Sequence, residues 1–197
     1  MTDTTRAQFL TRAGKGGLAL VAGGSILGFA EGTAFASGSR VTSDADIAKV
    51  AATAELLAID FYTRAIASKQ LKGDELAYLV GAKANEVAHY DALKGVLKSA
   101  TPSGLSFKYP AGSFASAKSI GNLGHALETA FVGAYMSAVV AFSSNELKGV
   151  AAEIGACESR HLSVLTNIGA GAIVPAPNLP ETVTLAAATK AVTGFVA

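Results

Sequence analysis

The sequence predicts an all-α protein: a four-helix bundle with a long crossover between helices 2 and 3 and a C-terminal tail. Apolar residues recur at three- and four-residue spacing over four segments of about 25 residues. A segment rich in Pro and Gly separates the second segment from the third, and no stretch alternates as a β-strand would. Helices of this length and order bury their apolar faces against one another in a bundle.

Residues 1–36 are expected to be a secretory signal that precedes the bundle. Basic residues come first, an apolar, Gly-rich run covers residues 18–30, and an Ala-Phe-Ala sequence ends at Ala36. This order is typical of a signal cleaved after Ala36, and about thirteen apolar residues are too few to span a bilayer comfortably. An uncleaved anchor or a buried helix is the alternative. Residues 5–10 resemble the twin-arginine export motif, with Ala7 where the second arginine belongs.

The first two predicted helices cover residues 43–68 and 74–99. Ser43 precedes two acidic residues, and a serine there can cap a helix whose N-terminus favours negative charge. The polar break between the helices lets the second return antiparallel to the first. Residues 101–115, with two Pro and two Gly, form the crossover. About 15 extended residues reach roughly 50 Å, more than the roughly 38 Å of a 25-residue helix, so helix 3 can start parallel to helix 2.

The remaining helices are expected from Ser116 or Ala117 to about residue 142 and from residue 145 to about residue 168. Residues 175–180 contain three prolines and are expected to be extended, while residues 185–195 could form one short helix in a tail packed on the body. The predicted organisation is a signal over residues 1–36, a bundle over 37–174 and a tail over 175–197.

Composition excludes several classes of protein. Half of the residues are hydrophobic and 16% are charged, which excludes a disordered chain. A single cysteine excludes an internal disulfide and a four-cysteine zinc site. The net charge is +1 and basic residues form no block, so no nucleic-acid partner is expected, and no stable membrane span once the signal is cleaved.

Carboxylates occur where the predicted helices are most apolar. Glu128 is the only formally charged residue between Lys118 and Glu146, and Glu55 lies in a similar small and apolar stretch of helix 1. A buried carboxylate is costly unless a cation or a proton compensates it. Both glutamates therefore require a partner.

Helices 2 and 4 each carry a Glu-x-x-His sequence, one from Glu86 to His89 and the other from Glu158 to His161. Residues three apart share one helix face, so each pair can direct a carboxylate oxygen and an imidazole nitrogen at one metal ion. Such ligands suit iron or manganese, and zinc less exclusively. The alternative is a bundle in which these side chains only form buried hydrogen bonds with one another.

The spacing of these residues repeats in the two halves of the chain. Glu55 and Glu86 are 31 positions apart, Glu128 and Glu158 are 30 apart, and both midpoints fall in the predicted turns. The four glutamates therefore lie at one level of the bundle. Tyr62 and Tyr135, each seven residues after the glutamate of its helix, extend the repeat. The two tyrosines could be buried aromatic residues or could contact the ligands from outside the metal site. His125 could also contact the ligands, and the alternative is that it faces solvent.

With one Glu on each of two helices and Glu-x-x-His on the other two, residues 43–168 resemble the ferritin-like di-iron-carboxylate proteins. The resemblance implies bridging roles for Glu86 and Glu158, terminal roles for Glu55 and Glu128, and one metal each for His89 and His161. The implied cofactor is two iron ions, with two manganese ions as the alternative. Cys157 points away from Glu158 and is expected to be a small buried residue, not a ligand.

The chain is also similar to exported ferritin-like domain proteins of the desiccation-related type, which implies a stress role. The expected function is oxidation of Fe(II) or consumption of O₂ or peroxide in the periplasm or outside the cell, at coordination positions that the ligands leave open. The alternatives are a manganese catalase-like enzyme and a non-catalytic stress protein in which metal ties the helices together. A homo-oligomer is compatible with the sequence, and a many-subunit storage cage is less favoured by the near-neutral charge and the Pro-rich tail.

Overall fold

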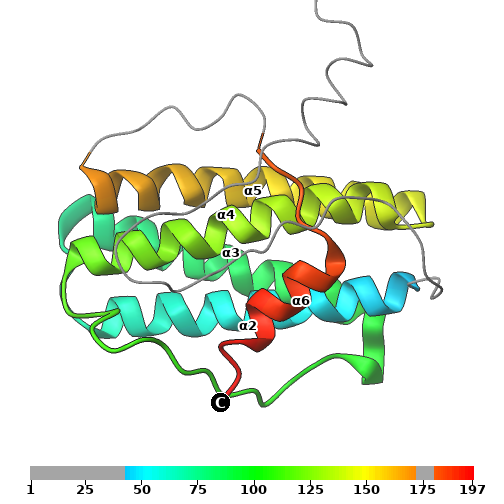
Figure 1. Ribbon diagram of the computed structural model, residues 1–197, viewed down its shortest axis with the longest axis horizontal. Helices are drawn as coiled ribbons and strands as arrows, with labels where there is room; N and C mark the ends of the chain where they lie inside the picture. Colours follow the sequence, from blue (N-terminus) through cyan, green and yellow to red (C-terminus); the bar gives the residue numbers. More distant parts are fainter. Residues whose placement is uncertain (1–42, 172–179) are drawn as a thin grey trace, which may run out of the picture. The chain divides into compact units, whose positions relative to one another are not determined.

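The computed structural model describes residues 43–171 and 180–197, which form a bundle of four long helices with a short fifth helix against it (Figure 1). Within these residues the extended structure is limited to one antiparallel bridge between Phe107 and Val196. The all-α fold class is confirmed, and the expected signal over residues 1–36 lies outside the described residues. The helices are α2 (Asp44–Ala67), α3 (Gly73–Leu97), α4 (Ala117–Ala141), α5 (Asn145–Ala170) and α6 (Leu185–Thr193), with a 3₁₀ turn at Lys98–Ala100.

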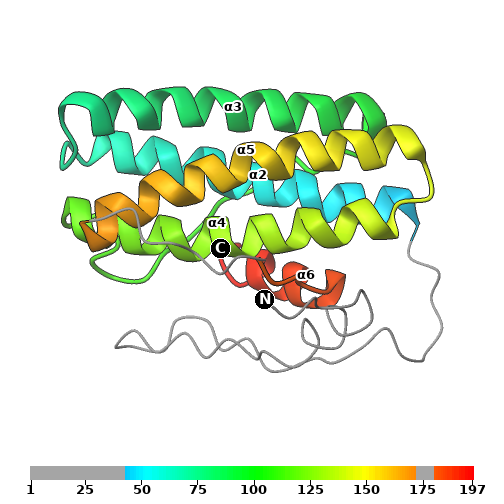
Figure 2. The same cartoon turned by 90° about the horizontal axis from the view of Figure 1, so that it is seen from above.

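The four long helices form two antiparallel hairpins, α2 with α3 and α4 with α5 (Figures 1 and 2). The crossover after the 3₁₀ turn leads the chain back along the bundle, so that α4 runs parallel to α3, as the length of the linker predicted. The four helices thereby bring their middle turns to one level.

Serines cap the N-termini of three helices, and two of these caps are reciprocal. Ser43 caps α2 together with Asp46, and Ser116 caps α4 together with Ser119, each through a reciprocal pair of hydrogen bonds to the backbone. The carboxylate of Asp44 accepts bonds from the backbone N–H groups of the turn between α4 and α5, at 2.7 and 3.0 Å. These bonds lower the pKa of Asp44 and attach the start of α2 to the second hairpin.

The glycines of α4 are sites of close approach between helices. A Cβ on Gly121 would lie 2.3 Å from the backbone nitrogen of Gly169 on α5, and one on Gly124 would lie 2.7 Å from the Leu165 side chain. The cost of glycine in a helix is thus offset by tight packing of α4 on α5. Among the described helices, α4 is the one that is long and apolar enough to span a membrane. Core helices of soluble proteins also meet this criterion, and 56% of the apolar stretch of α4 is buried inside the protein.

The C-terminal segment packs against α2 and α4. Val183 donates its backbone N–H to the Gly133 carbonyl at 3.0 Å, and α6 follows. The helix ends at Thr193, two residues before the predicted end, and the residues after it pair with the crossover, where the backbone N–H of Lys108 donates to the carbonyl of Phe195. Helix α5, in contrast, continues two residues past its predicted end and stops at Gly171, whose φ of +76° favours glycine.

Candidate metal centre

The middle of the bundle contains a cluster of acidic and imidazole side chains, one set from each of the four long helices. The four glutamates are at most 1% exposed, and His161 is fully buried. His89 has a side chain that is 12% exposed. The structure thus brings together all six residues expected from the sequence as ligands. This six-residue cluster consists of Glu55, Glu86, His89, Glu128, Glu158 and His161.

The six-residue cluster divides into two groups of four residues, each with ligand atoms within 4.8 Å of one another. Two glutamates, Glu86 and Glu158, belong to both groups. One group adds Glu55 and His89, and the other adds Glu128 and His161. This arrangement could hold metal between the four helices.

Six atoms of the cluster lack hydrogen-bond partners. Burial of a polar atom without a partner costs free energy, and such atoms are rare in folded proteins. Among the described residues, every side-chain nitrogen or oxygen that is buried without a partner belongs to the six-residue cluster. The donor set therefore fits a bound cation that would complete these contacts. The atoms are Glu55 Oε2, both carboxylate oxygens of Glu86, His89 Nδ1, Glu128 Oε2 and Glu158 Oε1.

Each histidine directs the same nitrogen at the carboxylates. His161 Nδ1 lies 2.8 Å from Glu86 Oε1 and 2.9 Å from Glu158 Oε2. His89 Nδ1 lies 3.3 Å from Glu158 Oε1 and 3.4 Å from Oε2 of both Glu55 and Glu86. The two imidazoles thus take equivalent places in the two halves of the bundle, as the repeated spacing predicted.

Comparison with protein families agrees with this geometry. The family described as ferritin-like domain matches residues 43–170, which is more than half of the 197-residue chain. The chain belongs to the ferritin-like domain family. Comparison with curated proteins returns no match. The matched residues hold the four long helices of this ferritin-like protein and all six residues of the cluster.

Without a cation, protons must compensate the carboxylates of the ferritin-like centre. Burial, with the charge of Glu158 next, raises the pKa of Glu55 and of Glu128 well above the usual value. Burial would also raise the pKa of Glu86, but the neighbouring imidazoles of His161 and His89 outweigh it and lower this pKa to about 2. Burial opposes protonation of His161, yet its hydrogen bond with Glu158 and the nearby carboxylate of Glu86 raise its pKa to about 9. Metal binding must displace these protons.

Two tyrosines hold the outer oxygens of two of these carboxylates. The Tyr62 hydroxyl on α2 donates to Glu128 Oε1 on α4 at 2.6 Å, and the Tyr135 hydroxyl on α4 donates to Glu55 Oε1 on α2. Each tyrosine therefore serves the glutamate of the opposite hairpin, not the one on its own helix. Side chains on a helix lean toward its N-terminus, so each hydroxyl reaches back toward the level of the cluster. In both glutamates the other oxygen, Oε2, remains without a partner.

Sequence reasoning missed the side chains that surround His161. Its Nε2 lies 3.2 Å from the amide nitrogen of Asn85 on α3 and 3.7 Å from the sulfur of Cys157 on α5. The ring of Tyr78 approaches it edge-on at 6.1 Å. Asn85 precedes His89 by four residues, as Cys157 precedes His161, so the repeat contained a signal for this pair. Cys157 is buried, as expected, but it also contacts a histidine of the cluster.

The hydrogen bond of the His125 side chain is to a residue outside the six-residue cluster. Its Nδ1 is 2.8 Å from Thr166 Oγ1, a contact between α4 and α5. Burial lowers its pKa. The structure therefore links His125 to Thr166, while the proposed support of the ligands by this histidine stays a prediction.

Proposed function

We propose that this ferritin-like protein holds two iron ions in the six-residue cluster and is an exported oxidoreductase that oxidises Fe(II) or consumes O₂ or peroxide. The observation that carries the proposal is the set of buried, unpartnered side-chain atoms in the described part of the chain, all of which belong to the cluster. Two overlapping groups of four potential ligands support a dinuclear site. Two divalent ions would balance the four carboxylates that otherwise repel one another.

Under this proposal, Glu86 and Glu158 are ligands common to both ions. Glu55 and His89 complete one ion, and Glu128 and His161 complete the other. The bound pair would supply redox chemistry and open coordination positions for a small oxidant.

The protein's own groups have three tasks around that pair. Tyr62 and Tyr135 fix one oxygen of Glu128 and Glu55 and leave the second oxygen for the metal. Asn85 holds the His161 ring from its Nε2 side: when Nδ1 binds metal and Nε2 carries the proton, rotation of the Asn85 amide by 180° would present its oxygen to accept that hydrogen bond. Burial of all four glutamates keeps bulk water from the carboxylates.

The first test is the metal content of the purified protein after anaerobic loading with Fe(II) or Mn(II). We expect two ions per chain, and loss of both in Glu86→Ala and Glu158→Ala because these residues belong to both groups. Glu153→Ala is the matched control, since Glu153 is an exposed glutamate of α5. Absence of specific metal from the wild-type protein would overturn the proposal and favour a hydrogen-bonded core.

Turnover separates the remaining alternatives. Metal-dependent consumption of O₂ or peroxide, or oxidation of Fe(II), would support the oxidoreductase. A dimanganese form that decomposes peroxide without an external reductant would support a manganese catalase-like enzyme. Increased stability on metal binding without turnover would support a structural stress protein. Light scattering would show whether the protein assembles into a cage.

Export is proposed from the basic, apolar and small-residue order of residues 1–36. The mass of the protein recovered from the periplasm or the medium should correspond to cleavage after Ala36. Recovery of the uncleaved chain in the cytoplasm would refute export. A stress role, in the manner of desiccation-related proteins, predicts that loss of the protein sensitises cells to peroxide or drying.

A further inference from the structure

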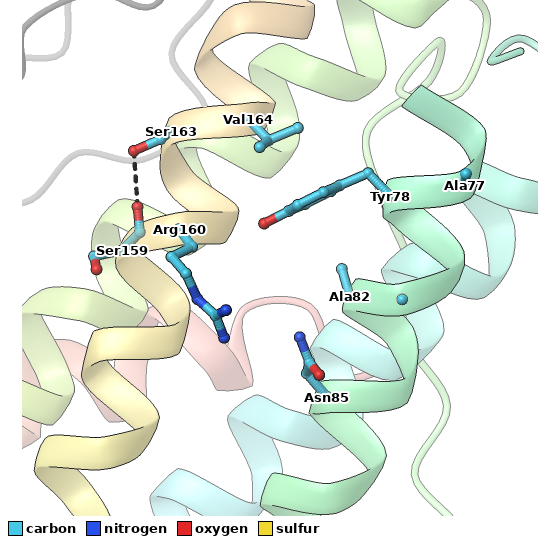
Figure 3. Close-up of a pocket in the computed structure, with 9 residues that line it drawn as sticks. Ala77, Tyr78, Ala82, Asn85, Ser159, Arg160, Ser163 and Val164 are labelled. Atoms are coloured by element: carbon cyan, nitrogen blue, oxygen red, sulfur yellow. Dashed lines mark hydrogen bonds between the residues drawn. The ribbon is translucent and has the colours of Figure 1, made fainter. Parts of the chain in front are cut away.

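A cleft with a volume of about 730 Å³ opens between α3 and α5 beside the metal centre (Figure 3). Small residues on α3, Ala77, Gly81 and Ala82, leave this space on one side. Ser159 and Ser163 of α5 line the other side, one turn apart. The hydroxyls of both serines donate to carbonyls of α5 itself, so the space depends on the small residues of α3 and could admit a small molecule.

Three polar side chains of the cleft point toward one another across it: Arg160 from α5, and Tyr78 and Asn85 from α3 (Figure 3). The guanidinium of Arg160 makes no salt bridge with any carboxylate among residues 43–171 and 180–197. Its Nη2 donates to the sulfur of Cys157 at 3.0 Å, which uses one of its five N–H groups. The cleft thus contains a cation with free donors.

We propose that this cleft is a binding site for a small oxyanion, held by Arg160 together with the Tyr78 hydroxyl and the Asn85 amide. A guanidinium binds carboxylate or phosphate oxygens through two parallel N–H groups. Burial raises the pKa of Tyr78 to about 12, so its hydroxyl keeps its proton and donates. The ring of Tyr78 and the side chain of Val164 supply apolar walls for the remainder of an organic anion.

The inner end of the cleft contacts the metal centre through His161. Asn85, which lines the cleft, and Cys157, which accepts from Arg160, both contact His161 Nε2. An anion in the cleft would therefore lie one side chain away from His161, a proposed metal ligand. Anion binding itself needs no metal, and only this link to the metal centre rests on the proposed function.

Titration of the metal-free protein with inorganic phosphate and with benzoate, followed by NMR of backbone and side-chain amides, tests the site. We expect saturable binding of at least one anion, with shifts centred on Asn85 and the turn of α5 that carries Arg160. Arg160→Gln should weaken binding at least tenfold, and Arg160→Lys should be intermediate because lysine keeps the charge but not the planar fork. Tighter binding of benzoate would assign an organic carboxylate, and tighter binding of phosphate an inorganic oxyanion.

The matched control is Lys94→Gln, which removes one positive charge from an exposed position of α3 outside the cleft. Binding should be unchanged in this variant, because the site depends on Arg160 and not on the net charge. Absence of saturable binding, or equal weakening in both variants, would overturn the proposal. The variant Glu86→Ala, which should lose metal, should still bind the anion, so failure of the anion site and failure of the metal site are distinguishable.

Discussion

Replacing Glu128 by glutamine should stabilise the metal-free protein while removing its stabilisation by metal. Glu128 is 1% exposed, and burial followed by the charge of Glu158 raises its pKa well above 4.5. The folded protein therefore binds a proton that the unfolded chain releases once the pH exceeds 4.5. The free energy of unfolding must fall as pH rises from that value toward the raised pKa. Glutamine is neutral and retains an oxygen to accept the Tyr62 hydroxyl.

The difference in the free energy of unfolding between the wild type and Glu128→Gln follows from the binding of this one proton. Between pH 4.5 and the raised pKa, each pH unit lowers the free energy of unfolding of the wild-type protein by about 1.4 kcal/mol relative to that of Glu128→Gln. The difference in stability should therefore grow in favour of the variant as the pH rises above 4.5, and should level off once the pH passes the raised pKa. Addition of Fe(II) or Mn(II) should reverse the order, because the variant has lost a charged ligand.

Urea unfolding of chelator-treated protein, followed by far-UV circular dichroism at several pH values, measures the difference. Glu153→Gln is the control, since Glu153 is exposed and its replacement should cause no pH-dependent difference. The reasoning would be refuted if the stability difference between Glu128→Gln and the wild type did not change with pH. An equal change in Glu153→Gln would refute it as well.

Three further predictions concern the two tyrosines, the protons of the cluster and the close contact of α4 with α5 at Gly121. Tyr62→Phe and Tyr135→Phe should each weaken metal binding about 10- to 100-fold, because each hydroxyl orients a ligand carboxylate; calorimetry showing unchanged affinity would contradict this. Metal loading should release protons, and affinity should rise with pH, because the cluster is protonated without metal; a pH-stat that records no release would exclude this account. Gly121→Ala should destabilise the protein by about 3 kcal/mol or more, because its Cβ would lie 2.3 Å from a backbone nitrogen of Gly169. The helical control Gly149→Ala, with no atom within 4 Å of the added Cβ, should gain up to about 1 kcal/mol in urea unfolding.

Hydrophobic spacing, serine caps and the distances between glutamates were sufficient to predict the helices and the level of the six-residue cluster. In an antiparallel hairpin, residues equidistant from the turn face each other, so the midpoints of the Glu55–Glu86 and Glu128–Glu158 pairs located both ligand sets. The length of the crossover predicted that α4 runs parallel to α3. These properties depend on distances along the chain, which the sequence contains.

Contacts between the two hairpins required the tertiary structure. Periodicity places Tyr62 on the helix face that carries Glu55, but it does not show that the hydroxyl bonds Glu128 of the other hairpin. Likewise, Asn85 lies one turn before His89 yet contacts His161, and His125 contacts Thr166. Such pairings depend on the rotation of each helix about its axis and on the separation of the helices. Both are set by packing, including the glycine contacts of α4 with α5, and not by the spacing within any one helix.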